Sequence, residues 1–175
     1  EQSLLGGLML DALAWDKVAD VITSEDFYRK DHRLIFQAIA NLIDGGSPCD
    51  VVTVSEHLDG RSELDDSGGL EYLATLSNET PGAANARAYA KIIRERATLR
   101  ALIHAGNEIA GSAFTSDGRT AAEVLDNAER MVFEIAEKGT RGKKGFKSLK
   151  QILPAAVDRI DMLHQSEGNI TGIST

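Results

Sequence analysis

Apolar residues recur at intervals of three and four along nearly the whole chain, without sustained strand-like alternation of apolar and polar residues. This pattern predicts an all-α fold. Five short helices are expected within residues 1–80, where they should pack into one small globular bundle. Their expected ranges include 1–11, 13–22, 31–44 and 69–77. One more helix is expected to start at Pro48 and Asp50 and to reach Leu58.

The first expected helix contains two adjacent glycines, Gly6 and Gly7. Two glycines cost a helix about 1–2 kcal/mol relative to two alanines, so a compensating close approach of a neighbouring helix is expected there. Asp31 can cap the third helix, and Gly45-Gly46 should end it. The side chains expected to face the core are Leu4, Leu5, Leu8, Met9, Trp15, Val18, Ile22, Ile35, Ile39, Leu42, Ile43, Leu70, Leu73 and Leu76.

A much longer helix is expected over residues 86–113, where no proline interrupts the apolar pattern. About 28 residues make a rod of about 42 Å, which a small bundle cannot cover. After a polar loop, Thr120 and Glu123 form a capping box for a second long helix that ends at Lys138. Residues 86–138 should therefore form an antiparallel helical hairpin that projects from the bundle.

The hairpin should keep part of its apolar surface uncovered. The positions expected to point inward on its first helix are Tyr89, Ile92, Ile93, Leu99, Ile103, Ile109 and Ala110, and the second helix carries Val124, Leu125, Ala128, Val132 and Ile135. A contiguous exposed apolar surface usually marks an interface. The residues predicted to mediate self-association or contact with a partner are Leu99, Ile103, Ile109 and Leu125.

The composition changes after residues 1–138, which form the expected N-terminal helical domain. Residues 139–147, GTRGKKGFK, contain three glycines, four basic residues and no acid, which indicates a flexible linker. An amphipathic helix is expected over residues 148–166, with a kink or a start at Pro154. Its apolar stripe is Leu149, Ile152, Leu153, Val157, Ile160 and Leu163. Residues 167–175 should lead into a further domain.

Charge and cysteine content narrow the class of protein. The net charge is −8, and residues 1–138 hold 13 basic against 24 acidic side chains, which argues against a domain built to neutralise a phosphate backbone. Cys49 is the single cysteine, so an intramolecular disulfide is excluded. The sequence shows no signal peptide and no long apolar span, which predicts a soluble, cytoplasmic protein with no membrane association.

No motif for catalysis, cofactor binding or metal binding emerges. A phosphate-binding loop of the form GxxxxGK[ST] is missing from the sequence. His104 and Glu108 share a helix face, but two residues do not make a metal site, and a solvated face is the favoured interpretation. Cys49 is interpreted as an inert thiol, Asp65-Asp66 as a solvated turn, and Trp15 as a core residue.

Basic residues line the first long helix. Arg87, Lys91 and Arg94 share one face, and Arg96 and Arg100 form a second pair four residues apart. A solvated face is the favoured interpretation, with contact to an acidic protein or to nucleic acid as the alternative. The lack of interleaved aromatic residues disfavours a platform for single-stranded nucleic acid.

Five ordered segments together resemble the bacterial replicative DNA helicase family DnaB. They are EQSLLGGLMLD with Trp15, DFYRKDHRLIFQAI, GSPCDVVTV, GGLEYLATL and PGAANARAYAKIIRERATLR. The resemblance covers that family's N-terminal domain and linker helix, and ITGIST resembles the segment that leads into its RecA-like ATPase core. The ATP-binding and DNA-translocating motifs belong to that core, so no catalytic residue is carried over and these residues alone should lack ATPase activity.

The resemblance implies a ring hexamer whose N-terminal domains pair through their hairpins into a collar that receives primase. It also implies that the linker helix docks on the neighbouring subunit's motor domain through the stripe from Leu149 to Leu163, and that a loader protein engages the helicase. ATP, magnesium and single-stranded DNA would bind the motor domain. The alternatives are a stand-alone helical adaptor and a nucleic-acid-binding module, the latter disfavoured by the excess of acid.

Overall fold

The structure is a computed structural model that describes residues 1–115 and 118–139. These residues form helices and turns and contain no strand, which confirms the predicted all-α fold. The described residues do not include the linker predicted at 139–147, the helix predicted at 148–166 or the connection predicted at 167–175. Of these, Gly139 alone is described, as the last residue of the last helix.

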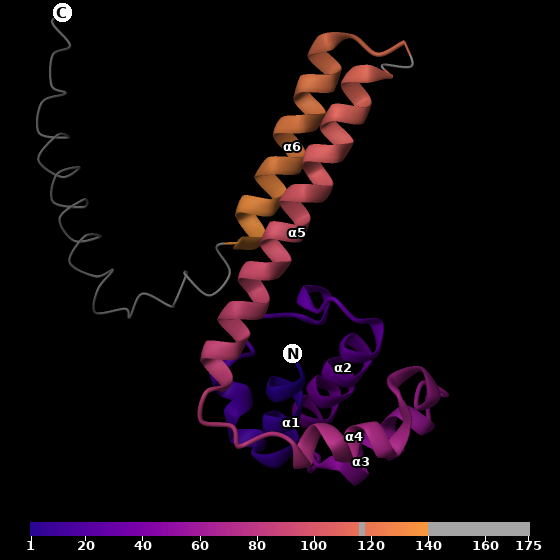
Figure 1. Cartoon of the computed structure of the whole chain (residues 1–175), viewed down its shortest axis with the longest axis vertical. Helices are drawn as coiled ribbons and strands as arrows, with labels where there is room; N and C mark the ends of the chain where they lie inside the picture. Colours follow the sequence, from indigo (N-terminus) through magenta and orange to yellow (C-terminus); the bar gives the residue numbers. More distant parts are fainter. Residues whose placement is uncertain (116–117, 140–175) are drawn as a thin grey trace, which may run out of the picture. The chain divides into compact units, whose positions relative to one another are not determined.

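A bundle of short helices forms the base of the described part, and two long helices rise from it as a hairpin (Figure 1). The bundle contains α1 (Gln2–Leu10), the 3-10 helices η1 (Ala12–Lys17) and η2 (Ser24–Asp26), α2 (Lys30–Asp44), α3 (Val51–Asp59), the 3-10 helix η3 (Asp65–Ser67) and α4 (Gly69–Asn78). The hairpin consists of α5 (Ala86–Phe114) and α6 (Ala121–Gly139).

The core is organised around α1, which packs against α2, α4, η1 and α5. Leu4, Leu5 and Leu8 are fully buried there, as their spacing predicts, and each contributes about 1.5–3 kcal/mol by its burial. The other helices and turns add Val18, Ile22, Phe27, Ile35, Phe36, Ile39, Val54, Leu58, Leu73, Leu76, Ala86, Ala90 and Ile93 to this core, with Trp15, Leu42 and Ile43 partly buried against it.

Gly6 explains how α1 and α4 come so close together. A Cβ atom at Gly6 would lie 2.0 Å from Leu76 O and 2.2 Å from Thr80 Oγ1. The Thr80 hydroxyl itself donates to Leu76 O over 2.7 Å, so the end of α4 occupies the space that any side chain would need. The predicted close approach of a neighbouring helix at the two glycines is confirmed.

Several helix ends follow their local sequence signals. The Asp50 carboxylate accepts from Thr53 N over 2.9 Å, and Thr53 Oγ1 accepts from Asp50 N over 2.9 Å, so α3 begins with a reciprocal cap. Thr120 and Glu123 make the same arrangement before α6, with Thr120 N donating to Glu123 Oε2 over 2.7 Å. Each such cap stabilises its helix by about 1 kcal/mol.

The predicted capping role of Asp31 is wrong. α2 begins at Lys30, and Arg29 is the cap residue, with extended backbone angles (φ −80°, ψ 138°). The Asp31 side chain accepts from His32 N over 2.8 Å and pairs with Arg29. A carboxylate in the first turn still stabilises the helix, because it interacts with the unpaired N–H groups there. Asp31 therefore favours a helix start at this point of the chain, although it is not the cap residue.

Two further predictions need correction. Residues 13–22 do not form an α-helix, because the Asp11 carboxylate accepts from Leu13 N over 3.0 Å and starts the tighter 3-10 helix η1, which gives way to turns. Leu70 is 51% exposed rather than buried. It lies in the first turn of α4, directly after Gly68 and Gly69, whose positive φ angles of 95° and 76° turn the chain before the helix reaches the core.

Candidate protein-docking surface

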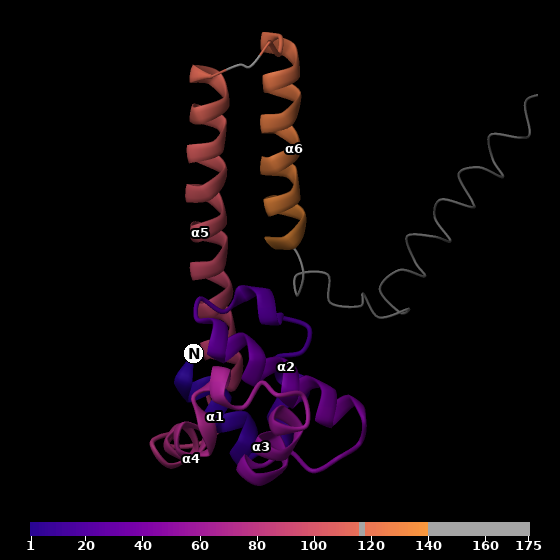
Figure 2. The ribbon, with the colours of Figure 1, turned by 90° about the vertical axis from the view of Figure 1, so that its right-hand side faces the viewer.

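The hairpin is held together by small residues on α5 and larger ones on α6. α6 runs back alongside α5 (Figure 2), and the two helices are in extensive contact. Ala101 and Ala105 are four residues apart and face α6, where Met131 and Ile135 are half-buried. Only Ala105 of this pair of alanines is fully buried, so the helices meet along a narrow seam.

The residues predicted for self-association or partner contact lie on the surface of the hairpin. Ile103 is 66% exposed, Leu125 is 58% exposed, Leu99 is also exposed, and Ile109 is half-buried. The expectation that Ile92, Leu99, Ile103 and Ala110 point inward is wrong for the single chain. The apolar core of the bundle covers only the first two turns of α5, where Ala86, Ala90 and Ile93 are buried, and the rest of the rod extends beyond that core.

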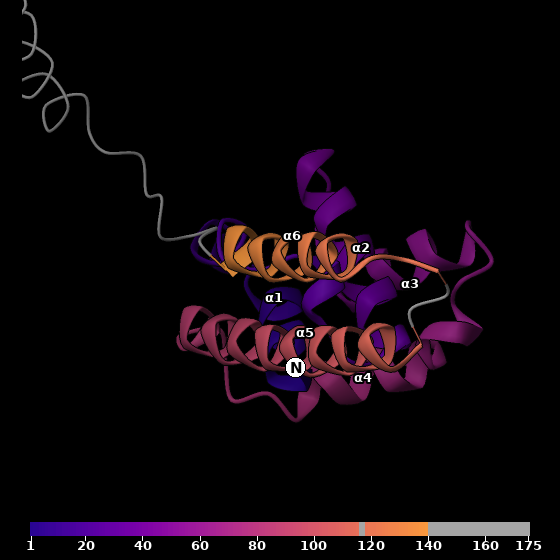
Figure 3. The ribbon, with the colours of Figure 1, turned by 90° about the horizontal axis from the view of Figure 1, so that it is seen from above.

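Helix geometry places most of these side chains on one side of the hairpin. Leu102 lies about 100° around α5 from Ala101, and Val132 lies about 100° around α6 from Met131. Both helices are right-handed and run in opposite directions. A rotation of about 100° in the chain direction therefore turns Leu102 and Val132 toward the same side of the hairpin. Figure 3 shows the two helices from above. We call this surface the apolar flank, and its members are Leu99, Leu102, Ile103, Ile109, Leu125 and Val132.

The other side of the hairpin is charged. His104 pairs with Glu108 over 3.2 Å, and Arg130 pairs with Glu134 over 3.0 Å. A groove of about 490 Å³ runs between the helices here, because the α5 positions on its floor are small alanines. The interpretation of His104 and Glu108 as a solvated helix face is confirmed, since both side chains are largely exposed.

The basic residues of α5 divide into two kinds. Arg87, Lys91 and Arg96 are exposed, as a solvated face requires. The same interpretation is wrong for Arg94 and Arg100. Arg94 Nη1 lies 2.5 Å from Asp26 Oδ1 and Arg100 Nη2 donates to Asp26 O over 2.6 Å, so both side chains hold α5 to the bundle. Asp26 is 68 residues before Arg94, and no local pattern reveals that pairing.

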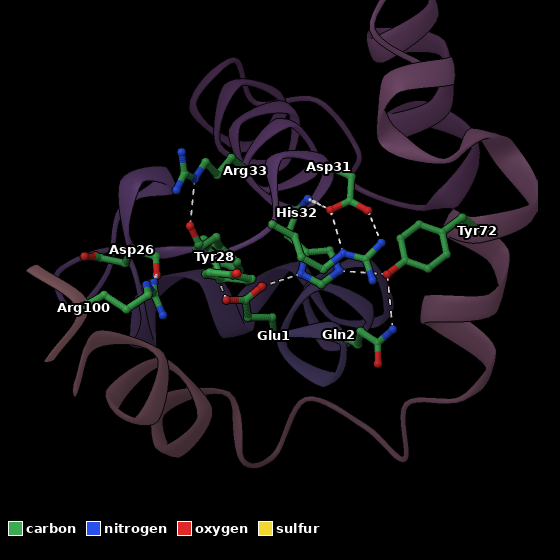
Figure 4. A network of polar contacts seen from close by, with 11 residues as sticks. Glu1, Gln2, Asp26, Tyr28, Asp31, His32, Arg33, Tyr72 and Arg100 are labelled. Carbon is green, nitrogen blue, oxygen red and sulfur yellow. Dashed lines mark hydrogen bonds and ion pairs between the residues drawn. The ribbon is translucent and has the colours of Figure 1, made fainter. Parts of the chain in front are cut away.

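A buried polar network inside the bundle was not predicted (Figure 4). His32 is almost fully buried, with Nδ1 2.5 Å from Glu1 Oε2 and Nε2 2.8 Å from the Tyr72 hydroxyl. Tyr28 N donates to Glu1 Oε1 over 2.8 Å. Partial burial raises the pKa of Glu1, but these hydrogen bonds outweigh it and hold the pKa below its ordinary value. The network joins the N-terminal ends of α1, α2 and α4.

The described residues contain no group of three His, Cys, Asp or Glu side chains that could hold a metal ion. Among the helices described, none combines the length and the apolar character that a bilayer crossing needs.

Cys49 is expected to react slowly in the folded chain. Burial and the neighbouring Asp50 carboxylate raise its pKa from 9.0 to about 11, which lowers the thiolate fraction at pH 8 about 100-fold. Alkylation by iodoacetamide at pH 8, followed by mass spectrometry, should therefore be at least about 10-fold slower for the native chain than for the chain in urea. Equal rates in the two conditions would contradict the inert role predicted for this thiol.

Residues 1–95 match the family described as "DnaB-like helicase N terminal domain". Among curated proteins, the chain is 42% identical over 177 residues to the replicative DNA helicase DnaB of Pasteurella multocida and, equally, to that of Haemophilus influenzae. It is 38% identical to the enzyme of Geobacillus stearothermophilus over 175 residues. In all three cases the whole chain is covered, and it spans 38% of the relative's length.

Solved structures also resemble the chain. The crystal structure of the N-terminal domain of the DnaB helicase from Mycobacterium tuberculosis has a TM-score of 0.74 and 40% sequence identity, covering 76% of this chain and 93% of that one. The structure of a DnaB-like replicative helicase, described with its interactions with primase, has a TM-score of 0.67 at 20% identity, covering 99% of this chain and 38% of that one. The second likeness concerns the fold alone.

Proposed function

This chain belongs to the family of DnaB-like helicase N-terminal domains, and from that membership we propose that it is the assembly and primase-docking region of a hexameric replicative DNA helicase. The observation that carries the proposal is the apolar flank. A flank of leucine, isoleucine and valine side chains that the chain's own bundle leaves exposed is a surface suited to burial against another protein. The relative described with its interactions with primase supports primase as one such protein.

The proposal assigns two uses to the hairpin. One is pairing with a second copy of the chain, since the two copies of a two-fold symmetric dimer meet through the same self-complementary patch. The other is capture of primase during primosome formation. Leu99, Ile103, Ile109 and Leu125 are the residues proposed to make these contacts, because they are spread over both helices of the flank.

The rest of the proposal concerns the longer protein that the curated relatives imply. We propose that the parent is an ATP-dependent DNA helicase of the cytoplasm that unwinds replication forks. ATP, magnesium and single-stranded DNA would bind its RecA-like motor domain, and a loader protein would engage the ring. The stripe from Leu149 to Leu163 would dock on the neighbouring subunit's motor domain. A stand-alone adaptor is not favoured, because the relatives that cover the whole chain are replicative helicases.

Capture of primase tests the proposed function. The chain of residues 1–175, immobilised on a sensor surface, is expected to bind the primase of the same organism. Leu125→Asp should weaken that binding at least about 10-fold, because it places a charge where an apolar side chain worth about 1.5–3 kcal/mol would be buried.

Val52→Asp is the matched control, since Val52 is an equally exposed apolar residue on α3 of the bundle. Its binding should equal that of the parent chain. No measurable binding by the parent chain, or equal binding by the parent chain and by Leu125→Asp, would count against the proposal.

A further inference from the structure

Residues 26–28, from the last residue of η2 toward the start of α2, are firmly attached to the bundle (Figure 4). The Phe27 side chain is completely buried, with its ring centre 4.8 Å from that of Phe36. Arg33 Nε donates to Phe27 O over 2.7 Å, and Tyr28 N donates to Glu1 Oε1 over 2.8 Å. We call residues 26–28 the joint segment.

The same segment is the point at which two arginines of α5 are attached. The Asp26 carboxylate lies 2.5 Å from Arg94 Nη1, and its other oxygen accepts from Thr23 N over 2.8 Å. Arg100 Nη2 donates to Asp26 O over 2.6 Å, and the Arg100 guanidinium lies 5.4 Å from the centre of the Tyr28 ring. These contacts lie beyond Ile93, the last α5 residue of the bundle core.

Nothing comparable supports the hairpin from its other helix. Among the described elements, α5 packs on α1, η1 and η2, whereas the extensive contacts of α6 are with α5. The direction of the hairpin relative to the bundle therefore depends on the first turns of α5 and on the joint segment.

The pair between Asp26 and Arg94 is sensitive to the loss of either partner. Their side chains are only 7% and 14% exposed, and within the described residues Arg94 Nε and Nη2 have no hydrogen-bond partner. Without the Asp26 charge, Arg94 would be a buried guanidinium with no counter-charge, which is strongly unfavourable. The Arg94 side chain can then move into the adjacent groove. Glu25 and Glu134 line the same groove and offer carboxylates nearer to solvent as new partners.

We propose that the joint segment sets the direction of the hairpin and that the Asp26–Arg94 pair is its latch. When the latch opens, the hairpin rotates about the first turns of α5 while the bundle and both long helices stay folded. The inference does not depend on what the hairpin binds. Asn107 is 13 residues beyond Arg94, about 20 Å along the rod, so a rotation of about 15° displaces it by about 5 Å.

Spin labels on the bundle and on the hairpin test this inference. In the chain of residues 1–175 with Cys49→Ala, labels are attached at Glu56→Cys on α3 and at Asn107→Cys on α5, two exposed positions. Double electron–electron resonance then gives the distribution of distances between them, with labelled chain diluted into unlabelled chain so that only distances within one molecule are measured. Circular dichroism monitors the helix content of every variant.

Asp26→Asn removes the charge while keeping the shape of the side chain, and it should shift or broaden the distribution by at least about 5 Å with unchanged helix content. Glu25→Gln is the matched control, because this exposed carboxylate lines the same groove, and its distribution should equal that of the parent. A distribution for Asp26→Asn that coincides with the parent's, or an equal change in Glu25→Gln, overturns the inference.

A second pair of variants decides the question if Asp26→Asn does not fold. Arg100→Met keeps most of the aliphatic stem but removes the contacts to Asp26 O and Tyr28, and Arg96→Met is its exposed control on the same helix. Arg100→Met should broaden the distribution and Arg96→Met should not. Coinciding distributions for both variants and the parent overturn the inference.

Discussion

Replacing Ile103 by Asp is expected to abolish self-association of the chain. Ile103 is a highly exposed member of the apolar flank, and in a two-fold symmetric pair the substitution occurs twice. Burial of an isoleucine is worth about 1.5–3 kcal/mol, so the two copies together lose about 3–6 kcal/mol of association free energy. The dissociation constant should rise at least about 100-fold, as measured by sedimentation at a series of protein concentrations.

Asn127→Asp is the control for this experiment. It also adds one negative charge to the hairpin, but Asn127 lines the charged groove on the other side, so the association should be unchanged. A parent chain that stays monomeric at high concentration, or an Ile103→Asp chain that associates as the parent does, would show that the apolar flank does not mediate pairing.

Gly6→Ala should destabilise the folded chain more than Gly7→Ala, where the new Cβ would come no closer than 3.3 Å to another atom. At Gly6 the new Cβ would lie 2.0 Å from Leu76 O, which belongs to the backbone of α4 and cannot rotate away. α1 and α4 would have to separate, and overpacking of this kind costs about 1–3 kcal/mol. Urea unfolding should show that decrease in the free energy of unfolding, and Gly6→Val should show a larger one.

The same substitution at Gly111 should have the opposite sign. Gly111 lies inside α5, and a Cβ there would meet no atom within 4 Å. Alanine is favoured over glycine in a helix by about 0.5–1 kcal/mol, so Gly111→Ala should raise the free energy of unfolding by that amount. Equal effects at the two positions would mean that the contact between α1 and α4 is not as tight as the structure shows.

The residues of the apolar flank have the sequence pattern of an inward-facing helix surface. The spacing of Leu99, Ile103 and Ile109 is that of a buried helix face, and it would be one if a second protein covered it. A hydrophobic pattern records that a face is to be buried and does not record whether the same chain buries it. The apolar core of the bundle reaches only as far as Ile93 along α5, so the single chain leaves these positions exposed.

Local sequence signals determined where most helices begin and end. The caps at Asp50 and at Thr120 involve residues three positions apart, and Gly45 ends α2 where the sequence predicts it. Apolar spacing identified Leu4, Leu5 and Leu8 as core residues, because a helix repeats every 3.6 residues and one face must be buried. These features depend on groups within about one turn of each other, and so the sequence predicts them.

Tertiary structure alone decided which polar groups far apart in the sequence meet. His32 reaches Tyr72 across 40 positions, and Arg94 reaches Asp26 across 68. The same basic pattern on α5 holds exposed Arg96 and buried Arg94, and only the position of η2 distinguishes them. A side chain's charge is a property of its residue type, but its burial and its partner are properties of the elements packed against it. For that reason the apolar flank could be proposed from spacing, whereas the latch at Asp26 required the fold.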